Sequence, residues 1–376
     1  MHMTITDDFS ALGLSEQMLE AVRAKGFETP TAIQKLTIPH LLTKPNDIIA
    51  QSQTGTGKTA AYGLPILQTL EPARGPIQAI ILVPTRELAL QAAEELLSYN
   101  REKRLSITAI YGGAAMSEQL RRLAKGIDIV VGTPGRVLDH IRRGTMKLEN
   151  VRYLVLDEAD EMLNMGFVED VEEIMSHTSD ERRVLLFSAT MPESIAALAA
   201  KILRNPVLVT VTPPASVVET IAQTVHFAEK AEKSQLLIDL LSASDAQQVL
   251  VFSRTKHGAD NIARMLKRAG IRSEAIHGNK SQGQRQRALG DFKSGKVKVM
   301  VATDIAARGI DVSELHTVIN YDLPDAAETY VHRIGRTGRA GHSGVALTFC
   351  SQDEHAKVRD IQKLTGRKLE TVSCTA

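Results

Sequence analysis

The 376-residue chain contains no tryptophan, and aromatic residues make up only 4% of it. Proteins that bind nucleic acids by stacking the bases need such side chains, so any nucleic acid bound here is expected to be held by its backbone, with little sequence preference. The two cysteines, Cys350 and Cys374, are too few for a disulfide framework or a zinc site. They indicate a reducing compartment, and we expect the protein to be cytoplasmic.

Long apolar runs are also missing. No run approaches the ~18 residues of a membrane span, and the N-terminus lacks a signal-peptide pattern, so we expect no membrane association. The composition, 43% hydrophobic and 24% charged, is that of a globular chain with ordinary cores. Its length predicts two or three domains.

The chain as a whole lacks an excess of one charge sign, since its net charge is +1. Its two parts differ, however: residues 1–210 hold 22 basic and 26 acidic side chains, whereas residues 211–376 hold 23 and 18. A charge of −4 in one part and +5 in the other mildly favours a polyanionic partner, and it is equally compatible with ordinary surface variation.

The most informative feature present is a glycine-rich turn at residues 52–59, with the sequence SQTGTGKT. It follows a short apolar strand at 47–50 and precedes a helical stretch at 59–70, which is the context that a phosphate-binding loop needs. Backbone N–H groups of such a turn hold anionic oxygens, Lys58 adds a positive charge, and the Thr59 hydroxyl can bind magnesium. The strict pattern has glycine where this chain has Ser52, so an ordinary tight turn remains an alternative for this segment alone.

Two consecutive carboxylates, Asp157 and Glu158, follow a predicted buried strand at residues 153–156. Asp157 is placed to hold magnesium, and Glu158 is placed to orient a water molecule. Together with the glycine-rich turn, this pair predicts an ATPase in which water attacks the γ-phosphate in line.

Short apolar strands alternate with helical segments twice along the chain. They are expected at 47–50, 79–83, 127–131, 153–156 and 184–187, and again at 249–252, 273–276, 297–301, 317–320 and 345–349. This alternation predicts an α/β protein with two doubly wound, helix-covered parallel sheets in tandem. Pro213 and Pro214 lie between the two sets and exclude a helix or a central strand there. We therefore predict domains at 1–210 and 220–376, joined by a linker at 211–219.

Polar and basic residues follow directly after seven of these strands. The segments are 84–86 (PTR), 133–136 (TPGR), 157–158 (DE), 188–190 (SAT), 253–255 (SRT), 277–278 (HG) and 303–304 (TD). In open parallel sheets, ligands bind at this edge. Each segment taken alone is better explained as a helix cap. Together, with basic side chains beside several caps, they predict a row of phosphate-binding positions on each sheet, suited to a nucleic-acid strand.

These motifs resemble those of the DEAD-box family of ATP-dependent RNA helicases over residues 9–339. The first part also carries GFETPTAIQ (26–34), with Phe9 before it, PTRELALQ (84–91), a glycine pair (112–113) and DEAD (157–160). The second part carries VFSRTK (251–256), HGNKSQGQR (277–285), ATDIAARGID (302–311) and HRIGRTGR (332–339). The motifs stand in family order, and residues 251–311 are most similar to the bacterial RhlE branch. The resemblance implies two RecA-like domains.

For the nucleotide, the resemblance implies ATP with Mg²⁺. The residues implied in binding are Phe27, Thr29, Gln34, Ser52, Gln53, Thr54, Gly55, Thr56, Gly57, Lys58, Thr59, Asp157, Glu158, Asp311, Arg336 and Arg339, with Thr59 and Asp157 toward the metal. Gln34 is expected to read the adenine edge through its amide while Phe27 stacks on the ring, and guanine is disfavoured because it would mispair that amide. Asp311 is expected to bind the ribose.

For catalysis, the resemblance implies Glu158 as the general base, Lys58 as a phosphate ligand, and an arginine finger that meets the transition-state charge. The finger residues are Arg336 and Arg339, and the residues implied in coupling are Asp160, Ser188, Thr190 and His332. Without the resemblance, the two arginines would be interpreted as a solvated pair and His332 as a structural histidine.

For RNA, the resemblance implies contacts from both domains. They are Pro84, Thr85, Arg86, Gly113, Thr133 and Arg136 in the first domain and Arg254, Gly278, Arg285 and Thr303 in the second. The position of Arg254 varies in residue type across the family. A preference for RNA over DNA would depend on contacts to the 2′-hydroxyl, which the spacing of motifs does not show.

The implied mechanism is closure of two lobes by ATP and RNA together, with local strand separation and release after hydrolysis. Two other classes remain open. An ATP-gated RNA clamp that nucleates a complex would use the same residues. A DNA translocase with the same two-lobe core is disfavoured by GFETPTAIQ and the DEAD tetrapeptide. RNA is the expected partner, and protein partners do not follow from the sequence.

Overall fold

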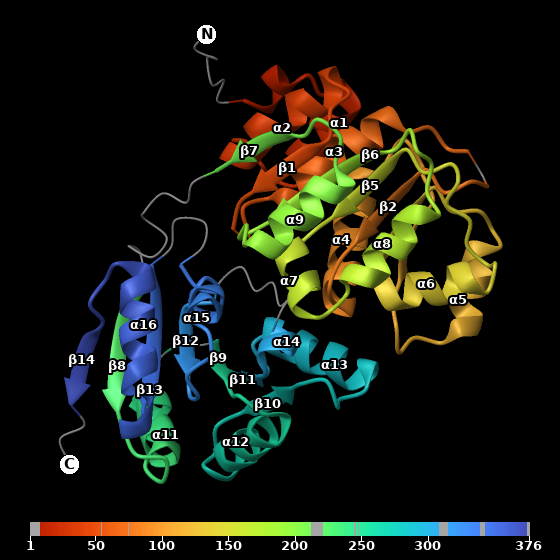
Figure 1. The fold of residues 1–376 in the computed structure, drawn as a ribbon. Coiled ribbons are helices and arrows are strands. Elements are labelled where there is room, and N and C mark those ends of the chain that lie inside the picture. The colour runs from red at the N-terminus through yellow and green to blue at the C-terminus, as the bar shows by residue number, and fades with distance from the viewer. Residues whose placement is uncertain are drawn as a thin grey trace. The chain divides into compact units, whose positions relative to one another are not determined.

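The computed structural model of the chain describes residues 8–53, 55–73, 75–211, 221–243, 246, 248–307, 315–338 and 343–373 (Figure 1). The chain divides into two compact units, Met1–Pro213 and Pro214–Ala376, each with its own sheet. Among the predicted site residues, Thr54, Asp311 and Arg339 lie outside the described residues, as does the predicted linker apart from residue 211. None of the described helices combines the length and the hydrophobicity needed to cross a bilayer.

The first unit is built on a seven-stranded parallel sheet with the order β3-β4-β2-β5-β6-β1-β7. The strands are β1 Ile48–Gln51, β2 Ala79–Leu82, β3 Ile107–Ile110, β4 Ile129–Gly132, β5 Tyr153–Leu156, β6 Arg183–Ser188 and β7 Val207–Thr210. The helices are η1 Phe9–Leu12, α1 Glu16–Arg23, α2 Ala32–Thr43, α3 Lys58–Thr69, α4 Arg86–Tyr99, α5 Met116–Leu123, α6 Pro134–Arg142, α7 Ala159–Asn164, α8 Val168–Ser176 and α9 Glu193–Ile202.

The second unit has a seven-stranded parallel sheet with the order β10-β11-β9-β12-β13-β8-β14. The strands are β8 Ile221–Phe227, β9 Val249–Phe252, β10 Ser273–Ile276, β11 Val299–Ala302, β12 Thr317–Asn320, β13 Gly344–Cys350 and β14 Glu370–Ser373, which pairs with β8 at the sheet edge. The helices are α11 Lys233–Ala243, α12 Lys256–Arg268, α13 Gln282–Lys293, α14 Asp304–Ala307, α15 Ala327–Ile334, η2 Gln352–Glu354 and α16 His355–Thr365. Counted from its own first strand, each sheet has the same order, so the two units repeat one topology.

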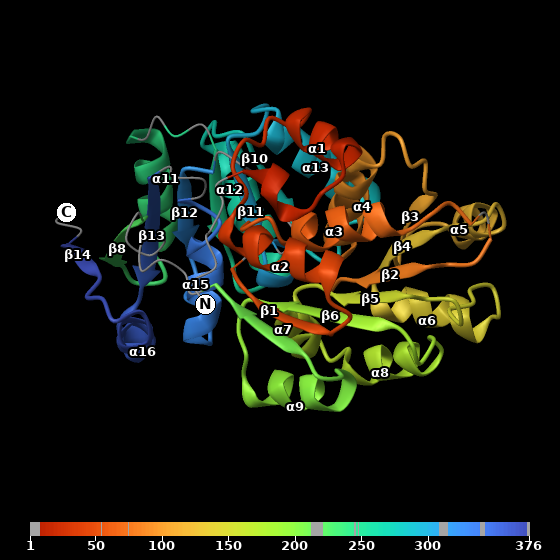
Figure 2. The same cartoon turned by 90° about the horizontal axis from the view of Figure 1, so that it is seen from above.

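Helices cover both faces of the first sheet, with α1–α4 on one side and α6, α8 and α9 on the other (Figure 2). The central strands are continuous apolar runs because both of their faces are buried. β2, with the sequence AIIL, is buried along its whole length. Its consecutive residues Ile80 and Ile81 belong to the cores on opposite faces of the sheet, as the alternation of side chains along a strand requires.

The predicted fold class is confirmed. All ten predicted strands are present, with ends displaced by up to two residues, and the helix predicted at 59–70 is α3. Four strands were not predicted: β3, β7, β8 and β14. Three of these lie at sheet edges and β8 lies next to one.

Candidate nucleotide site and neighbouring strand-end loops

The glycine-rich turn lies between β1 and α3, as predicted. The Ser52 N–H donates to the Ser188 carbonyl (3.0 Å), and α3 begins at Lys58. Gly55 and Gly57 have φ angles of 79° and 84°, a left-handed backbone that favours glycine. The Ser52 hydroxyl lies 3.1 Å from the Thr56 hydroxyl. Serine in place of the pattern's glycine therefore adds a contact inside the turn.

Lys58 lies beside the first carboxylate of the DEAD segment. Its ammonium is 4.0 Å from Asp157 Oδ1 and donates to the Ser52 carbonyl (3.3 Å), and both side chains are buried. The Asp157 carboxylate also accepts from the Tyr62 hydroxyl (3.1 Å) and from the Glu158 N–H (2.9 Å). Burial raises the pKa of Asp157, and the charge of Lys58 opposes the rise. A cation and a carboxylate thus converge next to the turn that would hold phosphates.

Tyr62 is a site residue that the motif analysis missed. It lies one turn after Lys58 on α3 and is fully buried, and its hydroxyl donates to the Asp157 carboxylate. Burial, and then the charge of Asp157, raise the pKa of Tyr62 well above its usual value, so the hydroxyl remains a hydrogen-bond donor. The signal available in the sequence was the spacing of four residues from the lysine, which places both on one helix face.

Glu158 has an unusual backbone conformation. With φ 54° and ψ 51° it is left-handed, and it is the N-cap of α7. For a residue other than glycine such a conformation costs about 1–3 kcal/mol, and it is typical of functional sites. The residue is 6% exposed. The strained turn holds two successive acidic residues at the end of β5.

Asp160 connects the DEAD segment to the SAT segment. Its Oδ2 accepts from the Thr190 N–H (2.9 Å) and the Thr190 hydroxyl (2.8 Å), and its own N–H donates to the Ser188 hydroxyl (3.3 Å). The Ser188 hydroxyl donates to the Thr190 carbonyl (2.7 Å). Three predicted coupling residues therefore form one network that joins the ends of β5 and β6.

Gln34 holds the glycine-rich turn through its side-chain amide. Its Nε2 donates to the Gly57 carbonyl (3.2 Å), and its Oε1 accepts from the Thr31 N–H (2.9 Å) in a capping box at the start of α2. A Cβ at Gly57 would come within 2.3 Å of that Nε2, so the close approach requires glycine. The described residues engage one of the two N–H groups of the amide, and the other can donate to an adenine edge. Phe27, 45% exposed, and Thr29, also exposed, lie in the segment before α2.

Predicted RNA contacts of the first unit gather at the ends of β2, β3 and β4, three neighbouring strands. The Arg86 guanidinium packs against Gly113, where a Cβ would lie 2.3 Å from Nη1. Arg136 Nη1 donates to the Ala114 carbonyl (3.2 Å). Both guanidinium groups are thus arranged along one loop, after β3.

Helix capping explains some of the strand-end residues and not others. The Thr85 hydroxyl, which follows the buried Pro84, accepts from the Leu88 N–H (3.3 Å) and caps α4. Thr133 is the N-cap residue of α6, but its side chain accepts no capping hydrogen bond. The capping interpretation therefore accounts for Thr85 and leaves the Thr133 hydroxyl to another role.

Predicted RNA contacts of the second unit follow β9, β10 and β11, which are also neighbours. The Thr303 N–H donates to the Ile276 carbonyl (3.4 Å), so the ends of β10 and β11 are joined. Gly278 faces open space, since a Cβ there would meet nothing within 4 Å. Arg285, on α13, is 8% exposed.

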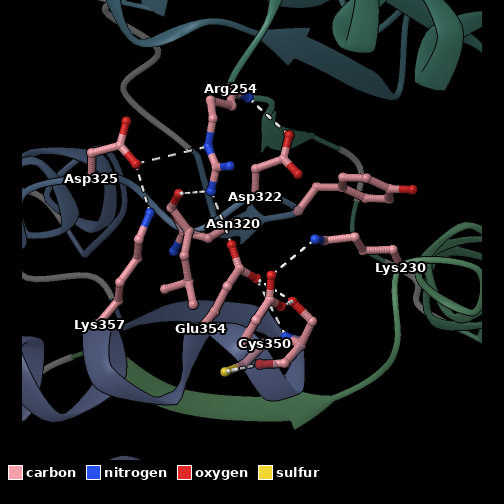
Figure 3. A network of polar contacts seen from close by, with 12 residues as sticks. Lys230, Arg254, Asn320, Asp322, Asp325, Cys350, Glu354 and Lys357 are labelled. Carbon is pink, nitrogen blue, oxygen red and sulfur yellow. Dashed lines mark hydrogen bonds and ion pairs between the residues drawn. The ribbon is translucent and has the colours of Figure 1, made fainter.

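Arg254 is engaged within its own unit (Figure 3). Its Nη2 donates to Glu354 Oε1 (2.9 Å) and to the Leu323 carbonyl (3.2 Å), and its Nε lies 3.9 Å from Asp325 Oδ1. Lys233 pairs with the same Glu354 (3.0 Å). An RNA phosphate would have to compete with two carboxylates for this guanidinium.

Arg336 and His332 belong to the segment formed by α15 and the residues after it. Arg336 is 8% exposed, and its N–H donates to the Arg333 carbonyl (3.1 Å), while His332 is half-buried. Arg333 itself, which the motif analysis passed over, is 2% exposed and paired with Asp304 at the start of α14. The available signal was its position inside HRIGRTGR, between two residues that were singled out.

Known proteins match this chain along both units. Residues 31–198 match the DEAD/DEAH box helicase family, and residues 232–341 match the helicase conserved C-terminal domain. The DEAD-box ATP-dependent RNA helicase CshA of Geobacillus kaustophilus is 46% identical over 362 residues, covering 96% of this chain and 77% of that protein. The structure of S. cerevisiae Dbp5 bound to RNA and ADP BeF3 has a TM-score of 0.90 at 33% identity, covering 98% of this chain and 96% of the other. The DEAD-box helicase Mss116 bound to ssRNA and UDP-BeF has a TM-score of 0.90 at 26% identity, covering 100% and 81%.

Each family match lies within one of the two compact units. The first contains the glycine-rich turn and the DEAD and SAT segments, and the second contains the strand-end loops of β9, β10 and β11 with the segment after α15. The narrower likeness to the RhlE branch stays a prediction. The chain belongs to the DEAD-box family of ATP-dependent RNA helicases.

Proposed function

We propose that this chain is an RNA-stimulated ATPase that separates RNA strands locally. The observation that carries the proposal is the strand order of the first sheet. The loops assigned to RNA follow β3, β4 and β2, whereas those assigned to ATP and to coupling follow β5, β6 and β1, so they occupy adjacent halves of one sheet edge. Helix N-termini at such an edge are suited to phosphates of both kinds. The names of the relatives and the RNA-bound structures support the same substrate class.

Adenine is the proposed base. The second N–H of Gln34 would donate to the adenine edge while the exposed ring of Phe27 stacks on the base, with Thr29 nearby in sequence. Guanine would mispair a buried amide, which costs about 1–3 kcal/mol. Equal turnover of ATP and GTP would contradict this assignment.

Mg²⁺ fits the oxygen donors next to the glycine-rich turn. Nowhere in the described residues do three or more His, Cys, Asp or Glu side chains gather in a way that could hold a metal ion. Mg²⁺ does not need such a group, since it is commonly bound by one or two carboxylates, water and substrate phosphates. Asp157 and the Thr59 hydroxyl are the residues that would hold it. When bound, it neutralises phosphate charge.

Hydrolysis is proposed to need residues of both units. Glu158 would orient and deprotonate the attacking water, Lys58 would bind the phosphates, and Arg336 with Arg339 would meet the developing charge. A finger of this kind contributes roughly 10³–10⁵ in rate, or about 4–7 kcal/mol. Asp311 is proposed as the ribose ligand. The support for Arg339 and Asp311 is their place in the family's motifs.

ATP and RNA are proposed to favour the same closed arrangement of the two units, so that each raises the affinity for the other. The network of Asp160, Ser188 and Thr190 supports this coupling because it joins the nucleotide end of β5 to β6. His332 is proposed to complete the coupling from the second unit. Closing on one strand of a duplex would displace its partner, and hydrolysis would reset the open state.

The proposal is tested by the choice of stimulating nucleic acid. ATP hydrolysis by the full chain is expected to rise on adding single-stranded RNA and to rise much less with the same amount of single-stranded DNA. A short RNA duplex should be separated in the presence of ATP. Equal stimulation by DNA would favour a translocase, and stimulation without strand displacement but with long-lived RNA complexes would favour a clamp.

The proposed compartment is the cytoplasm. Cys350 is a free, buried thiol. Such a thiol is compatible with the reducing conditions of that compartment.

A further inference from the structure

Among the described residues, Arg333 has the largest of the almost completely buried side chains, with 2% exposed. Its Nε and Nη2 form a forked pair with the two carboxylate oxygens of Asp304 (2.5 and 2.8 Å). Its Nη1 donates to Asn320 Oδ1 (3.2 Å) and to the Asp322 carbonyl (2.6 Å). The guanidinium carbon also lies 4.9 Å from the centre of the Phe252 ring.

A buried charge of this kind is expensive, so its presence calls for a reason other than packing. Four of the five N–H groups of Arg333 have acceptors, which offsets part of the desolvation cost. A hydrophobic side chain of similar volume would give a simpler core at no such cost. Such a hydrophobic side chain could not, however, fix the start of α14, the end of β12 and the helix α15 to one another.

These segments lie next to residues proposed for two different ligands. Thr303, a proposed RNA contact, immediately precedes Asp304, and the Arg336 N–H donates to the Arg333 carbonyl (3.1 Å). One peptide link, from Thr303 to Asp304, and two hydrogen-bonded contacts, from Asp304 to Arg333 and from Arg333 to Arg336, thus connect Thr303 to Arg336.

The loop after β9 is joined to the same guanidinium through Asp322. Asp322, whose carbonyl accepts from Arg333, also accepts through its carboxylate from the Ser253 hydroxyl (3.1 Å) and the Arg254 N–H (2.9 Å). Arg333 therefore contacts the segment that follows β11 directly, and Asp322 joins it to the segment that follows β9.

We propose that Arg333 is a positioning residue that holds Arg336 in a fixed place relative to the RNA-facing loops of the second unit. The role rests on the proposed function, in which Arg336 acts on the γ-phosphate when RNA is bound. RNA that fixes the loop at Thr303 would then also fix the arginine finger. Stimulation of hydrolysis by RNA would pass through the Asp304–Arg333 pair.

Arginine is needed for this role because of its shape as well as its charge. A lysine offers a single ammonium and cannot form the fork with Asp304 while also reaching Asn320 and the Asp322 carbonyl. Arg333→Lys is therefore expected to retain the buried charge and lose the positioning. Arg333→Met retains much of the volume and removes the charge.

The test measures ATP hydrolysis by the full chain with single-stranded oligouridine as the RNA. Arg333→Met and Asp304→Asn are each expected to lower the RNA-stimulated kcat by about 10²-fold, the effect of a misplaced catalytic group. The RNA concentration that gives half the maximal rate should change little, and so should the affinity for a fluorescent ATP analogue without RNA. The double variant should be no slower than the slower single variant, because the two residues act as one unit.

Tyr330→Leu is the matched control. Tyr330 is completely buried on the same helix, and its hydroxyl donates to Gln223 Oε1 (3.0 Å). Its replacement is expected to lower Tm and to leave the kcat of the folded protein unchanged. If Arg333→Met does not fold, Arg333→Lys and Asp304→Asn decide the question.

Three results would overturn the positioning role. They are a kcat for Arg333→Met within a few-fold of wild type, recovery of kcat at high RNA concentration, and an equal loss of kcat in Tyr330→Leu at the same loss of Tm. Recovery at high RNA would mean that Arg333 only shapes the RNA contact. Absence of RNA stimulation in the wild-type protein would instead refute the proposed function.

Discussion

Replacing Gln34 with glutamate exchanges one side-chain nitrogen for oxygen and tests how this amide serves the nucleotide. The hydrogen bond from the Thr31 N–H to Oε1 (2.9 Å) can persist, because glutamate serves a capping box as well as glutamine does. The second oxygen would take the place of Nε2, 3.2 Å from the Gly57 carbonyl, with no proton between the two oxygens. The residue is 4% exposed, so water cannot satisfy them.

The magnitude follows from these contacts. The lost hydrogen bond is worth about 1 kcal/mol, and an unpaired buried acceptor costs roughly 1–3 kcal/mol more. The glycine-rich turn can relieve the contact only by moving away from α2, so the cost of roughly 2–4 kcal/mol should appear in ATP binding. ATP affinity is then expected to fall roughly 30- to 900-fold.

Two measurements check the reasoning: equilibrium binding of a fluorescent ATP analogue and unfolding in urea. Gln34→Glu should lose affinity and only about 1 kcal/mol of unfolding free energy, the value of the lost hydrogen bond to Gly57, because the α2 cap is retained. Gln34→Ala is the control, since it loses the cap as well and should lose about 0.5–2 kcal/mol of stability. If Gln34→Glu binds ATP as tightly as the wild type, the amide does not hold the turn in the way described.

Glu158→Gln retains the size of the side chain and removes the base, so RNA-stimulated turnover should fall by about 10²–10⁴ while ATP binding persists, as phosphate release and nucleotide binding will show. Thr190→Val removes one of the two donors to Asp160 Oδ2, and the free energy of unfolding in urea should fall by about 1.5–3 kcal/mol. Thr190→Ser retains the hydroxyl and should be as stable as wild type. An equal loss of stability in both variants would contradict the hydrogen bond from the Thr190 hydroxyl to Asp160. Lys233→Met removes one of the two cations paired with the buried Glu354 carboxylate, Arg254 being the other, and should lower the free energy of unfolding by about 1.5–3 kcal/mol. Burial alone would raise the pKa of Glu354, but its hydrogen bonds and the Lys233 charge lower it overall, so the advantage of wild type over Lys233→Met should be full above the usual value of 4.5 and disappear as pH falls through the lowered pKa. Burial raises the pKa of the Cys350 thiol to about 11, so the native thiol should react slowly. In a Cys374→Ser variant, iodoacetamide should label the protein unfolded in urea but not the native protein. Rapid labelling of the native protein would show that the thiol is accessible.

The part of the fold that could be predicted from sequence is the part whose strands are buried on both faces. β2, with the sequence AIIL, is apolar throughout and was placed within one residue. β8, with the sequence IAQTVHF, mixes buried and exposed positions because it lies next to the sheet edge, and it was missed. β14, at that edge, has the sequence ETVS and owes its structure to pairing with β8, which no local pattern reveals.

For the site as well, the residues that could be predicted from sequence are those whose contacts are local in the chain. The glycine-rich turn and the Asp157–Glu158 pair are local in sequence because each one is a single turn of chain at a strand end, and the structure brings them together. The network around Arg254 is different, since Glu354 lies 100 residues further along the chain and its contact depends on the order of β9, β12 and β13. The sequence therefore predicts an RNA contact for Arg254 and does not reveal that two carboxylates pair with its guanidinium.

The pairing of β14 with β8 has a practical consequence for shortened versions of this protein. Thr371 lies opposite Val225 and Val372 opposite His226, so the last described strand closes the side of the second sheet. A chain cut before residue 370 would leave the seven-residue β8 as an open border with unpaired N–H and C=O groups, and such a border recruits strands from other molecules. Shortened proteins of this kind should be lost to self-association during concentration or storage, while their soluble fraction still hydrolyses ATP.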